Sequence, residues 1–402
     1  MSFKISTIFE YDSFIALDIG AFKIKALVCK VENGELKIIS QASTRQSRKD
    51  MLQGEVSDLR SVSDAVAKTI YKATESLENC PNDVIVWLNT PHFLYDTLSM
   101  NYVRQDPTQP IEMNEIDDII AGTERKSLDR LRSKIDTRIG LIDSEMKPVA
   151  TSLTAIYLDG QKVSNPVGFT GKNIKLNILN VFAPITKFNI TRNLVSNLDK
   201  NIVSIVPAPV SLPKLLEHTS YFEDSNLFID FWYSKTTIVV QNSGEILGMH
   251  VVPIGFSLFE DMLHKEWHRS YLETERLLAD IKECYKKHPQ ITDDFFALLF
   301  DSVYVAVRDI IDQVYFKNIF LSGASTAPEL QEKISEYFSQ KQGTVQPFVA
   351  DLLETSKYAQ SLNTEHSSWA WVAALAVVGR ELLTVKKDPI ARILRYVVYK
   401  YE

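Results

Sequence analysis

The stretch of this sequence best placed to do chemistry is an acidic residue that ends an apolar run and precedes a glycine. Residues 14–31 read FIALDIGAFKIKALVCKV, with Asp18 at the end of the first apolar run and Gly20 at the turn. Such a turn directs a carboxylate and several backbone N–H groups to one point, which suits a nucleotide phosphate and its metal ion. An acid followed by glycine after a strand is also ordinary hairpin chemistry. These residues alone leave both interpretations open.

The same plan returns in the second half of the chain. Residues 227–252 give an apolar run that reaches Asp230, a turn, a second apolar run, a turn at Gly244 and a third apolar run. Asp18 precedes Gly34 by 16 positions, and Asp230 precedes Gly244 by 14. Because internal repeats report architecture, the sequence predicts a duplicated three-strand unit with an acid at the first bend of each copy.

The composition is that of a soluble globular protein with more than one lobe. The chain has 402 residues, of which 45% are hydrophobic and 24% charged, and one hydrophobic core rarely grows to this size. The net charge of −7 argues against a nucleic-acid partner. Three widely separated cysteines give no zinc or redox spacing, which favours a reducing, cytoplasmic setting. No segment reaches the ~20 apolar residues of a transmembrane helix.

Between the two repeats the sequence predicts a small α+β unit over residues 91–184. A helix is expected at 114–120, followed by a charged stretch at 125–134 and by strands near 152–158 and 173–182. The segment YLDGQKVSNPVGFTGK, residues 157–172, is a turn-rich connection between these strands. Elsewhere we expect helices at 61–77, 186–198, 257–287, 293–314 and 367–383, and strands at 84–88, 202–210 and 319–322.

Together these features resemble the actin-like ATPases, in which two phosphate loops and an adenosine loop close on ATP between two lobes. Asp18 and Asp230 match the acids of the two phosphate loops, and the SGAS turn at 322–325 matches the adenosine loop. The segment YLDGQKVSNPVGFTGKNIKL is similar to the "DG…NP.G..G..L" segment of the bacterial FtsA family. That segment lies in an inserted subdomain that FtsA shares with the related PilM family. The resemblance covers residues 14–378 and implies an α/β, two-lobed, duplicated ribonuclease-H-like fold with an inserted α+β subdomain.

The resemblance also implies how the chain is divided into domains. The first lobe would hold the first phosphate unit, and the second lobe would hold the second phosphate loop and the adenosine loop. The expected boundaries are 1–83 and 184–209 for the first lobe, 84–183 for the inserted subdomain, 210–350 for the second lobe, 351–385 for a return to the first lobe and 386–402 for an amphipathic tail.

A site for ATP and Mg²⁺ follows from the same resemblance. Asp18 would hold the metal ion through water, and the N–H groups of Gly20, Ala21 and Phe22 would cradle phosphates. The other residues implied for this site are Lys23, Asp230, Thr236, Glu275, Gly323 and Ala324.

The site departs from the family pattern at four places. Ala21 stands where a hydroxyl residue is usual, and Trp-Tyr-Ser at 232–234 stands where glycines let the backbone approach phosphate. Ala324 replaces the second glycine of the adenosine loop, and Leu278 stands where a lysine usually follows the helix acid. The sequence therefore predicts weakened nucleotide binding or lost hydrolysis, and no efficient enzyme.

The end of the chain has the pattern of a cationic amphipathic helix. Asp388 and Pro389 suit a helix start, and the apolar residues that follow recur at i, i+3, i+4, i+7, i+8 and i+11. This pattern suits a helix lying in the plane of an anionic membrane, although a final core helix would show the same apolar face. The membrane-binding residues are then Ile390, Arg392, Ile393, Leu394, Arg395, Val397, Val398 and Tyr401.

The resemblance implies a cell-division scaffold that is peripheral on the cytoplasmic face of the membrane. It would tether filaments of FtsZ, or of an equivalent protein, to the inner membrane and would itself assemble into protofilaments. Two alternatives stay open. The first is a PilM-like adaptor of type IV pilus assembly, which would grip a peptide of a membrane partner. The second is an ATP-dependent enzyme of the sugar-kinase kind, which the glycine-poor second loop disfavours.

Overall fold

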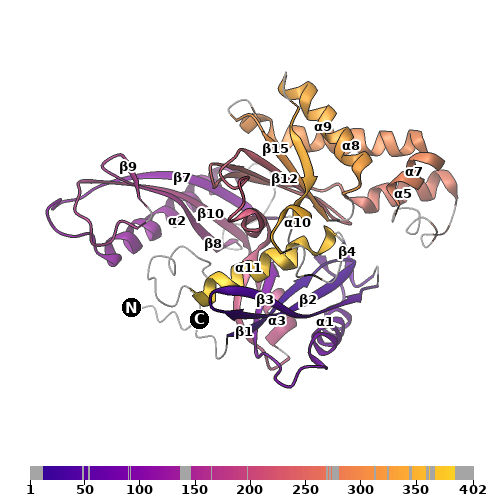
Figure 1. Cartoon of the computed structure of the whole chain (residues 1–402), viewed down its shortest axis with the longest axis horizontal. Helices are drawn as coiled ribbons and strands as arrows, with labels where there is room; N and C mark the ends of the chain where they lie inside the picture. The colour runs from indigo at the N-terminus through magenta and orange to yellow at the C-terminus, as the bar shows by residue number, and fades with distance from the viewer. Residues whose placement is uncertain are drawn as a thin grey trace.

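The computed structural model has two lobes, each built on a five-stranded sheet, and an inserted subdomain that extends from them as an arm (Figure 1). The residues implied at Glu275 and Ala324, and the tail at 386–402, lie outside the part of the chain that the structure describes. The described residues are 12–384 without 48, 53–54, 89, 91, 136–145, 164, 197, 269, 271–272, 274–279, 312–313, 324–325, 344–345, 359–361 and 363–366.

Lobe I is organised on a mixed sheet with the strand order β11-β6-β1-β2-β3. Short turns join β1, β2 and β3, so β2 runs antiparallel to both β1 and β3. β6 lies parallel to β1, and β11 lies parallel to β6. The strands are β1 (Ser13–Ile19), β2 (Lys23–Glu32), β3 (Glu35–Arg45), β6 (Asp83–Leu88) and β11 (Asn201–Pro207).

Lobe II repeats this topology strand for strand, with the order β16-β15-β12-β13-β14. The predicted duplication of three strands is therefore confirmed, and it extends to the two parallel strands on the other side of each sheet. The strands are β12 (Asn226–Phe231), β13 (Thr236–Asn242), β14 (Glu245–Val252), β15 (Asn318–Gly323) and β16 (Phe348–Asp351).

Helices cover these sheets, and α11 (Ala370–Thr384) is the most deeply buried of them. Every residue from 370 to 378 is buried, because the helix contacts β1, β2 and β6 of lobe I. The other helices of lobe I are α1 (Leu59–Thr74), α3 (Ile185–Ser196), the short α4 (Ala208–Ser211) and α10 (Leu352–Thr355), and the 3₁₀ turns η2 (Leu212–Leu216) and η4 (Ser367–Trp369). Those of lobe II are α5 (Phe256–Trp267), α7 (Ile281–Lys287), α8 (Pro289–Ile311) and α9 (Pro328–Gln342). Within the described ranges, no helix has the length and apolar character needed to cross a bilayer.

The arm is a four-stranded antiparallel sheet with one helix on it. Its strand order is β7-β10-β8-β9, and its elements are β7 (Leu94–Val103), α2 (Met113–Ile135), β8 (Met146–Leu158), β9 (Gln161–Val163) and β10 (Asn173–Pro184). The predicted helix at 114–120 was too short, because α2 continues through the charged stretch to Ile135. Buried Ile116, Ile120 and Leu131 keep one apolar stripe against the sheet while the charges face outward.

The base of the arm touches lobe II as well as lobe I. The Tyr95 hydroxyl of β7 lies 3.0 Å from Nε2 of His250 on β14, with the two rings edge to face. Gly248 makes this approach possible, because a Cβ there would lie 3.2 Å from the Tyr95 hydroxyl oxygen.

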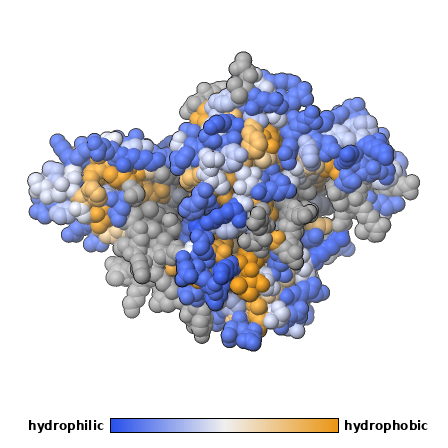
Figure 2. Space-filling model, in the orientation of Figure 1, coloured by the Kyte–Doolittle hydropathy of each residue, from blue (hydrophilic) through white to orange (hydrophobic). Residues whose placement is uncertain are grey.

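Hydrophilic residues dominate the face drawn in Figure 2, and hydrophobic surface is limited to small patches.

Two helix glycines give opposite predictions for stability. A Cβ at Gly379 in α11 would lie 2.3 Å from the Phe14 ring, whereas a Cβ at Gly122 in α2 would meet no heavy atom within 4 Å. We expect Gly379→Ala to lower the free energy of unfolding by about 1–3 kcal/mol through overpacking. Gly122→Ala, the matched control, should raise it by about 0.5–1 kcal/mol through helix propensity. Urea denaturation followed by circular dichroism measures both; equal effects would contradict the packing of α11 on β1.

Candidate functional site

Two equivalent loops meet at the contact between the lobes, the region that we call the cleft. Four residues lie between the last residue of β1, Ile19, and its partner Ile24 on β2. Four also lie between the last residue of β12, Phe231, and its partner Thr236 on β13. Asp18 and Asp230 each occupy the next-to-last position of their strand. The repeat therefore aligns Trp232 in lobe II with Gly20 in lobe I.

The indole ring of Trp232 lies directly against Gly20. A Cβ built on Gly20 would be 3.4 Å from Cζ3 of Trp232. Beside this contact, Phe22 of the first loop stacks on Tyr233 of the second, with ring centroids 6.0 Å apart. The two loops predicted to hold phosphates thus meet through aromatic side chains.

Trp232, which is partly buried, also packs with two buried indoles, and we call the three rings the tryptophan stack. It comprises Trp232, Trp87 at the end of β6 and Trp371 at the start of α11. The ring centroids of Trp87 lie 4.6 Å from Trp232 and 4.5 Å from Trp371, and those of Trp232 and Trp371 are 5.8 Å apart. Because Trp87 and Trp371 belong to lobe I, the stack anchors a loop of lobe II in the core of lobe I.

The backbone of the second loop is engaged by the first turn of α5. The carbonyl of Trp232 accepts from the Phe256 N–H at 3.0 Å, and that of Tyr233 accepts from the Ser257 N–H at 2.6 Å. Thr236, implied by the resemblance as a phosphate ligand, donates its hydroxyl to the Ile254 carbonyl at 2.8 Å. The loop is therefore fixed by contacts within lobe II.

Four ionisable side chains are buried around this aromatic contact. Asp18 and Asp230 have no exposed surface, and Lys25 and Lys235 are almost fully enclosed. The Lys25 ammonium lies 4.0 Å from Oδ2 of Asp18 and donates to the Ser368 carbonyl. On the other side of the cleft, the hydroxyl of Ser322 donates to Oδ1 of Asp230 at 2.5 Å. Neither oxygen of Asp18 accepts a hydrogen bond from the described residues.

Burial brings the pKa values of these acids and bases toward each other. Loss of solvation raises the pKa of Asp18 to about 7, although the nearby Lys25 opposes the shift. Loss of solvation likewise raises the pKa of Asp230 to about 7, and the Ser322 hydroxyl and the Trp371 indole oppose it. Burial lowers the pKa of Lys235 to about 7, and Asp230 opposes this change.

The structure places some of the residues implied for the nucleotide site at the cleft and others elsewhere. Asp18, Gly20 and Asp230 lie in the cleft, whereas Lys23 is exposed and places its ammonium 5.6 Å from the centre of the Phe22 ring. Gly323 has a structural reason for being glycine: its φ is +98°, and a Cβ would lie 2.1 Å from the Phe231 carbonyl oxygen.

Sequence reasoning missed four residues of this site, namely Lys25, Trp87, Lys235 and Trp371. For the two lysines a signal was present, because each lies within or directly before an apolar strand, where an unpaired charge is costly. The two tryptophans are separated by hundreds of residues in sequence, and no local pattern announces their contact with Trp232.

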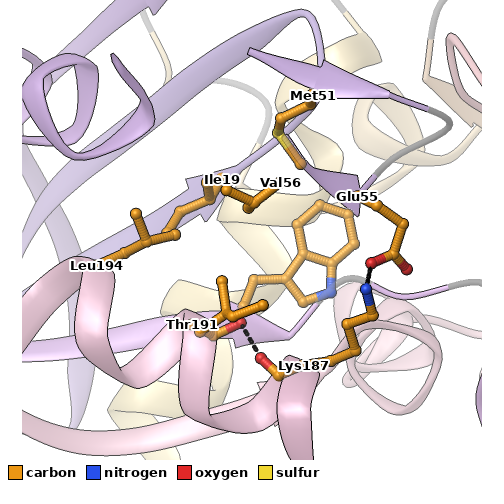
Figure 3. A pocket seen from close by; sticks show the side chains of 9 residues that line it. Ile19, Met51, Glu55, Val56, Lys187, Thr191 and Leu194 are labelled. Carbon is orange, nitrogen blue, oxygen red and sulfur yellow. Dashed lines mark hydrogen bonds and ion pairs between the residues drawn. The ribbon is translucent and has the colours of Figure 1, made fainter. Parts of the chain in front are cut away.

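Trp87 is one of the residues that line a small cavity in lobe I (Figure 3). The cavity lies between α3 and the short strands β4 (Met51–Leu52) and β5 (Glu55–Val56), and Lys187 forms an ion pair with Glu55 at its edge. Its volume of about 30 Å³ is far below the ~300 Å³ at which ligand pockets begin. The described residues also contain no group of three or more His, Cys, Asp or Glu side chains arranged to hold a metal ion.

A nucleotide does not fit these residues in their present arrangement. The backbone of the first loop is free to cradle a phosphate only where no side chain stands above Gly20, and the Trp232 ring occupies that position. The Asp18 carboxyl, with both oxygens unbonded in the described structure, keeps the chemistry of a water-mediated metal ligand. The acid is therefore retained while the space for the phosphates is filled.

Replacement of Asp18 by asparagine should change how stability depends on pH. The carboxyl has a pKa of about 7 in the folded chain against an ordinary value of 3.8, so the folded state binds this proton more tightly. Its contribution to stability is complete below pH 3.8 and is lost as the pH rises through 7. Relative to the unmodified chain, Asp18→Asn should therefore gain stability between about pH 4 and pH 7. Urea unfolding across this range measures the difference.

Asp58 provides a control of opposite sign for this measurement. It is exposed, and the backbone N–H of Ser61 together with its hydroxyl lowers the pKa of Asp58. Asp58→Asn should therefore lose stability relative to the unmodified chain as the pH rises from acid toward neutrality. Parallel pH profiles for the unmodified chain and Asp18→Asn would contradict the burial of an ionisable Asp18.

Comparison with known proteins gives matches in structure but none in sequence. No protein-family model and no curated protein matches the chain. Among solved structures, the PilM-PilN type IV pilus biogenesis complex matches with a TM-score of 0.65 and 12% identity, covering 91% of this chain and 98% of that one. The nucleotide-free diol dehydratase-reactivating factor matches with a TM-score of 0.51 and 8% identity, covering 92% and 99%.

A ROK family glucokinase from Streptomyces griseus, in complex with glucose and AMPPNP, matches more distantly, with a TM-score of 0.45, 10% identity and coverage of 90% and 98%. The likeness to the first two of these structures, at TM-scores of 0.65 and 0.51, shows that the chain has the two-lobed fold that the resemblance to actin-like ATPases implied.

Proposed function

We propose that this chain is an actin-like adaptor, a scaffold that holds partner proteins at a membrane and does not depend on ATP hydrolysis. The observation that carries the proposal is the position of Trp232, which lies on Gly20 and completes the tryptophan stack with Trp87 and Trp371. In an ATPase of this fold the same space must be open to phosphates. Here a side chain of the protein supplies the contact between the lobes.

The energetic argument supports a scaffold whose lobes are joined without a ligand. Each aromatic pair contributes about 0.5–1.5 kcal/mol beyond the area it buries, and two pairs of the stack, those of Trp232 with Trp87 and with Trp371, join lobe II to lobe I. The stacked Phe22 and Tyr233 add a further contact between the loops. Nucleotide would have to displace these contacts before it could bind.

For the partner, we propose filaments of FtsZ or of an equivalent protein, with the chain peripheral on the cytoplasmic face of the membrane. Two features of the sequence support this: the "DG…NP.G..G..L" segment of the arm and the cationic amphipathic pattern of residues 386–402. Longitudinal self-association into protofilaments belongs to the same proposal. Its chemistry is recruitment, and ATP, where bound at all, would promote assembly.

A second candidate is an adaptor of type IV pilus assembly. The observation that favours it is the structural similarity to the PilM-PilN complex over nearly the whole length of both chains. The two candidates share the fold and the role of an adaptor, but they differ in the partner that is bound. An ATP-dependent sugar kinase is a weaker third, because the second loop has Trp, Tyr and Ser in place of glycines.

Calorimetric titration with ATP and magnesium tests the role of Trp232. We expect no measurable binding by the unmodified chain, and we expect binding to emerge in Trp232→Ala, because removal of the indole opens the backbone of Gly20 to phosphate. Trp267→Ala is the matched control, since Trp267 contacts His288 in lobe II, away from the tryptophan stack. Submicromolar binding of ATP by the unmodified chain would contradict the proposal.

A reconstitution with vesicles tests the adaptor role. We expect the full chain to float with anionic vesicles and to carry FtsZ filaments with it. A chain lacking residues 390–402 should still sediment with FtsZ but lose the vesicles, because its apolar face and two arginines are gone. Neutral vesicles are the control for the electrostatic part of binding.

The same assay separates the two partner candidates. If the chain does not bind FtsZ but binds the cytoplasmic segment of a pilus membrane protein, the second candidate replaces the first. Failure of both partners to bind would contradict the adaptor role itself.

A further inference from the structure

The edge strand β7 presents an unpaired backbone along one side of the arm. β7 is the first strand of the sheet order β7-β10-β8-β9, so it has a neighbour on one side only. Its pairing with β10 runs over ten residues without a register shift, whereas β8 pairs with the same strand through two irregularities. A long, regular edge of this kind is a template for pairing with another strand.

The register identifies which backbone groups face outward. The Arg104 N–H bonds the Lys172 carbonyl, so the ladder to β10 uses the even-numbered positions of β7. The N–H and C=O groups of Thr97, Ser99, Asn101 and Val103 therefore point away from the sheet, and all four of these side chains are exposed. No described residue bonds this outer row of backbone groups.

The end of the strand is held rigidly in place by Arg104. This side chain is buried, and its guanidinium donates to both carboxylate oxygens of Glu115 and to the carbonyls of Gln109, Pro110 and Gly171. The loop that follows β7 and the loop that precedes β10 are thereby fixed to α2. A preformed edge loses little conformational freedom when another strand pairs with it.

The other described sheet edges carry features that block such pairing. Native proteins protect edges with charges, bulges, proline or short length. β9 has three residues with a lysine among them, and β16 has four. β3 and β14 contain charged residues and pair through register shifts, and β11 pairs through a shift and ends in proline. β7, in contrast, is ten residues long, has no proline and pairs without a register shift, and its one charged residue, Asp96, is buried.

The exposed part of β7 is also free of charge. Residues 97–103 read TLSMNYV, and the acid that precedes them, Asp96, is buried and lies 3.5 Å from the Arg130 guanidinium. When a strand pairs with an identical copy about a twofold axis, any charge near the axis faces a like charge. This strand has no charge that would oppose the pairing.

We infer that β7 is a self-association edge, through which two copies of the chain form a closed dimer with a continuous eight-stranded antiparallel sheet. The twofold axis passes near Ser99 and Met100, where the outer row is centred. This interface is independent of the adaptor proposal and of head-to-tail protofilaments, because it joins identical surfaces and closes after two copies.

Charge substitutions at Ser99 test the pairing directly. We expect the unmodified full chain to dimerise in sedimentation velocity, and we expect Ser99→Lys and Ser99→Glu each to raise the dimer dissociation constant roughly tenfold through like-charge repulsion. An equimolar mixture of the two variants should recover the dimer, because opposite charges then meet across the axis. Recovery in the mixture also shows that both variants are folded.

Gln161→Lys is the matched control, since it adds the same charge to the opposite edge of the same sheet, where it should leave the dimer unchanged. A monomeric unmodified chain would overturn the inference. So would a dimer that both Ser99 variants leave intact, a mixture that stays monomeric, or an equal loss of dimer in Gln161→Lys. Any of these results would mean that the edge serves another strand or none.

Discussion

The contact between an indole ring and a glycine backbone is the interaction on which the arrangement of the lobes depends. Trp232 and Gly20 occupy equivalent positions of a duplicated unit, so one copy supplies the ring and the other supplies the space for it. Duplication normally gives two similar loops that share a ligand between them. In this chain the two loops are complementary, because the Trp232 ring of one copy packs on the Gly20 backbone of the other.

Four ionisable groups are buried beside the aromatic contact, and the protein tolerates them because acids and bases are buried together. Burying a lone carboxylate or ammonium costs several kcal/mol, but here two acids and two bases are enclosed together, and Lys25 interacts with both Asp18 and Asp230. Their pKa values shift in opposite directions, which reduces the charge that must be buried. The buried acids and bases are therefore each other's electrostatic partners at the place where the lobes meet.

The sequence predicted the duplicated strands and the arm, because alternating apolar runs and turn residues are local signals. It also identified the aromatic second loop, since the departure from glycine is visible residue by residue. It could not predict that Trp87 and Trp371 would receive Trp232, because this contact is created by packing between distant segments. The length of α2 was underestimated for a related reason: its charged face concealed an apolar stripe that only the sheet beneath it makes meaningful.

The tryptophan stack also gives the contact between the lobes a spectroscopic signal. The chain has five tryptophans, and three of them, Trp87, Trp232 and Trp371, lie with ring centroids within 5.8 Å of one another. Rings this close couple electronically, and because Trp232 belongs to lobe II and the other two rings to lobe I, separation of the lobes would remove two of these couplings and change the near-ultraviolet circular dichroism and the fluorescence of the chain. Trp267 and Trp369 lie outside the stack. The protein thus contains its own optical gauge of lobe separation, which can be followed in an unlabelled chain as partners, membranes or nucleotides are added.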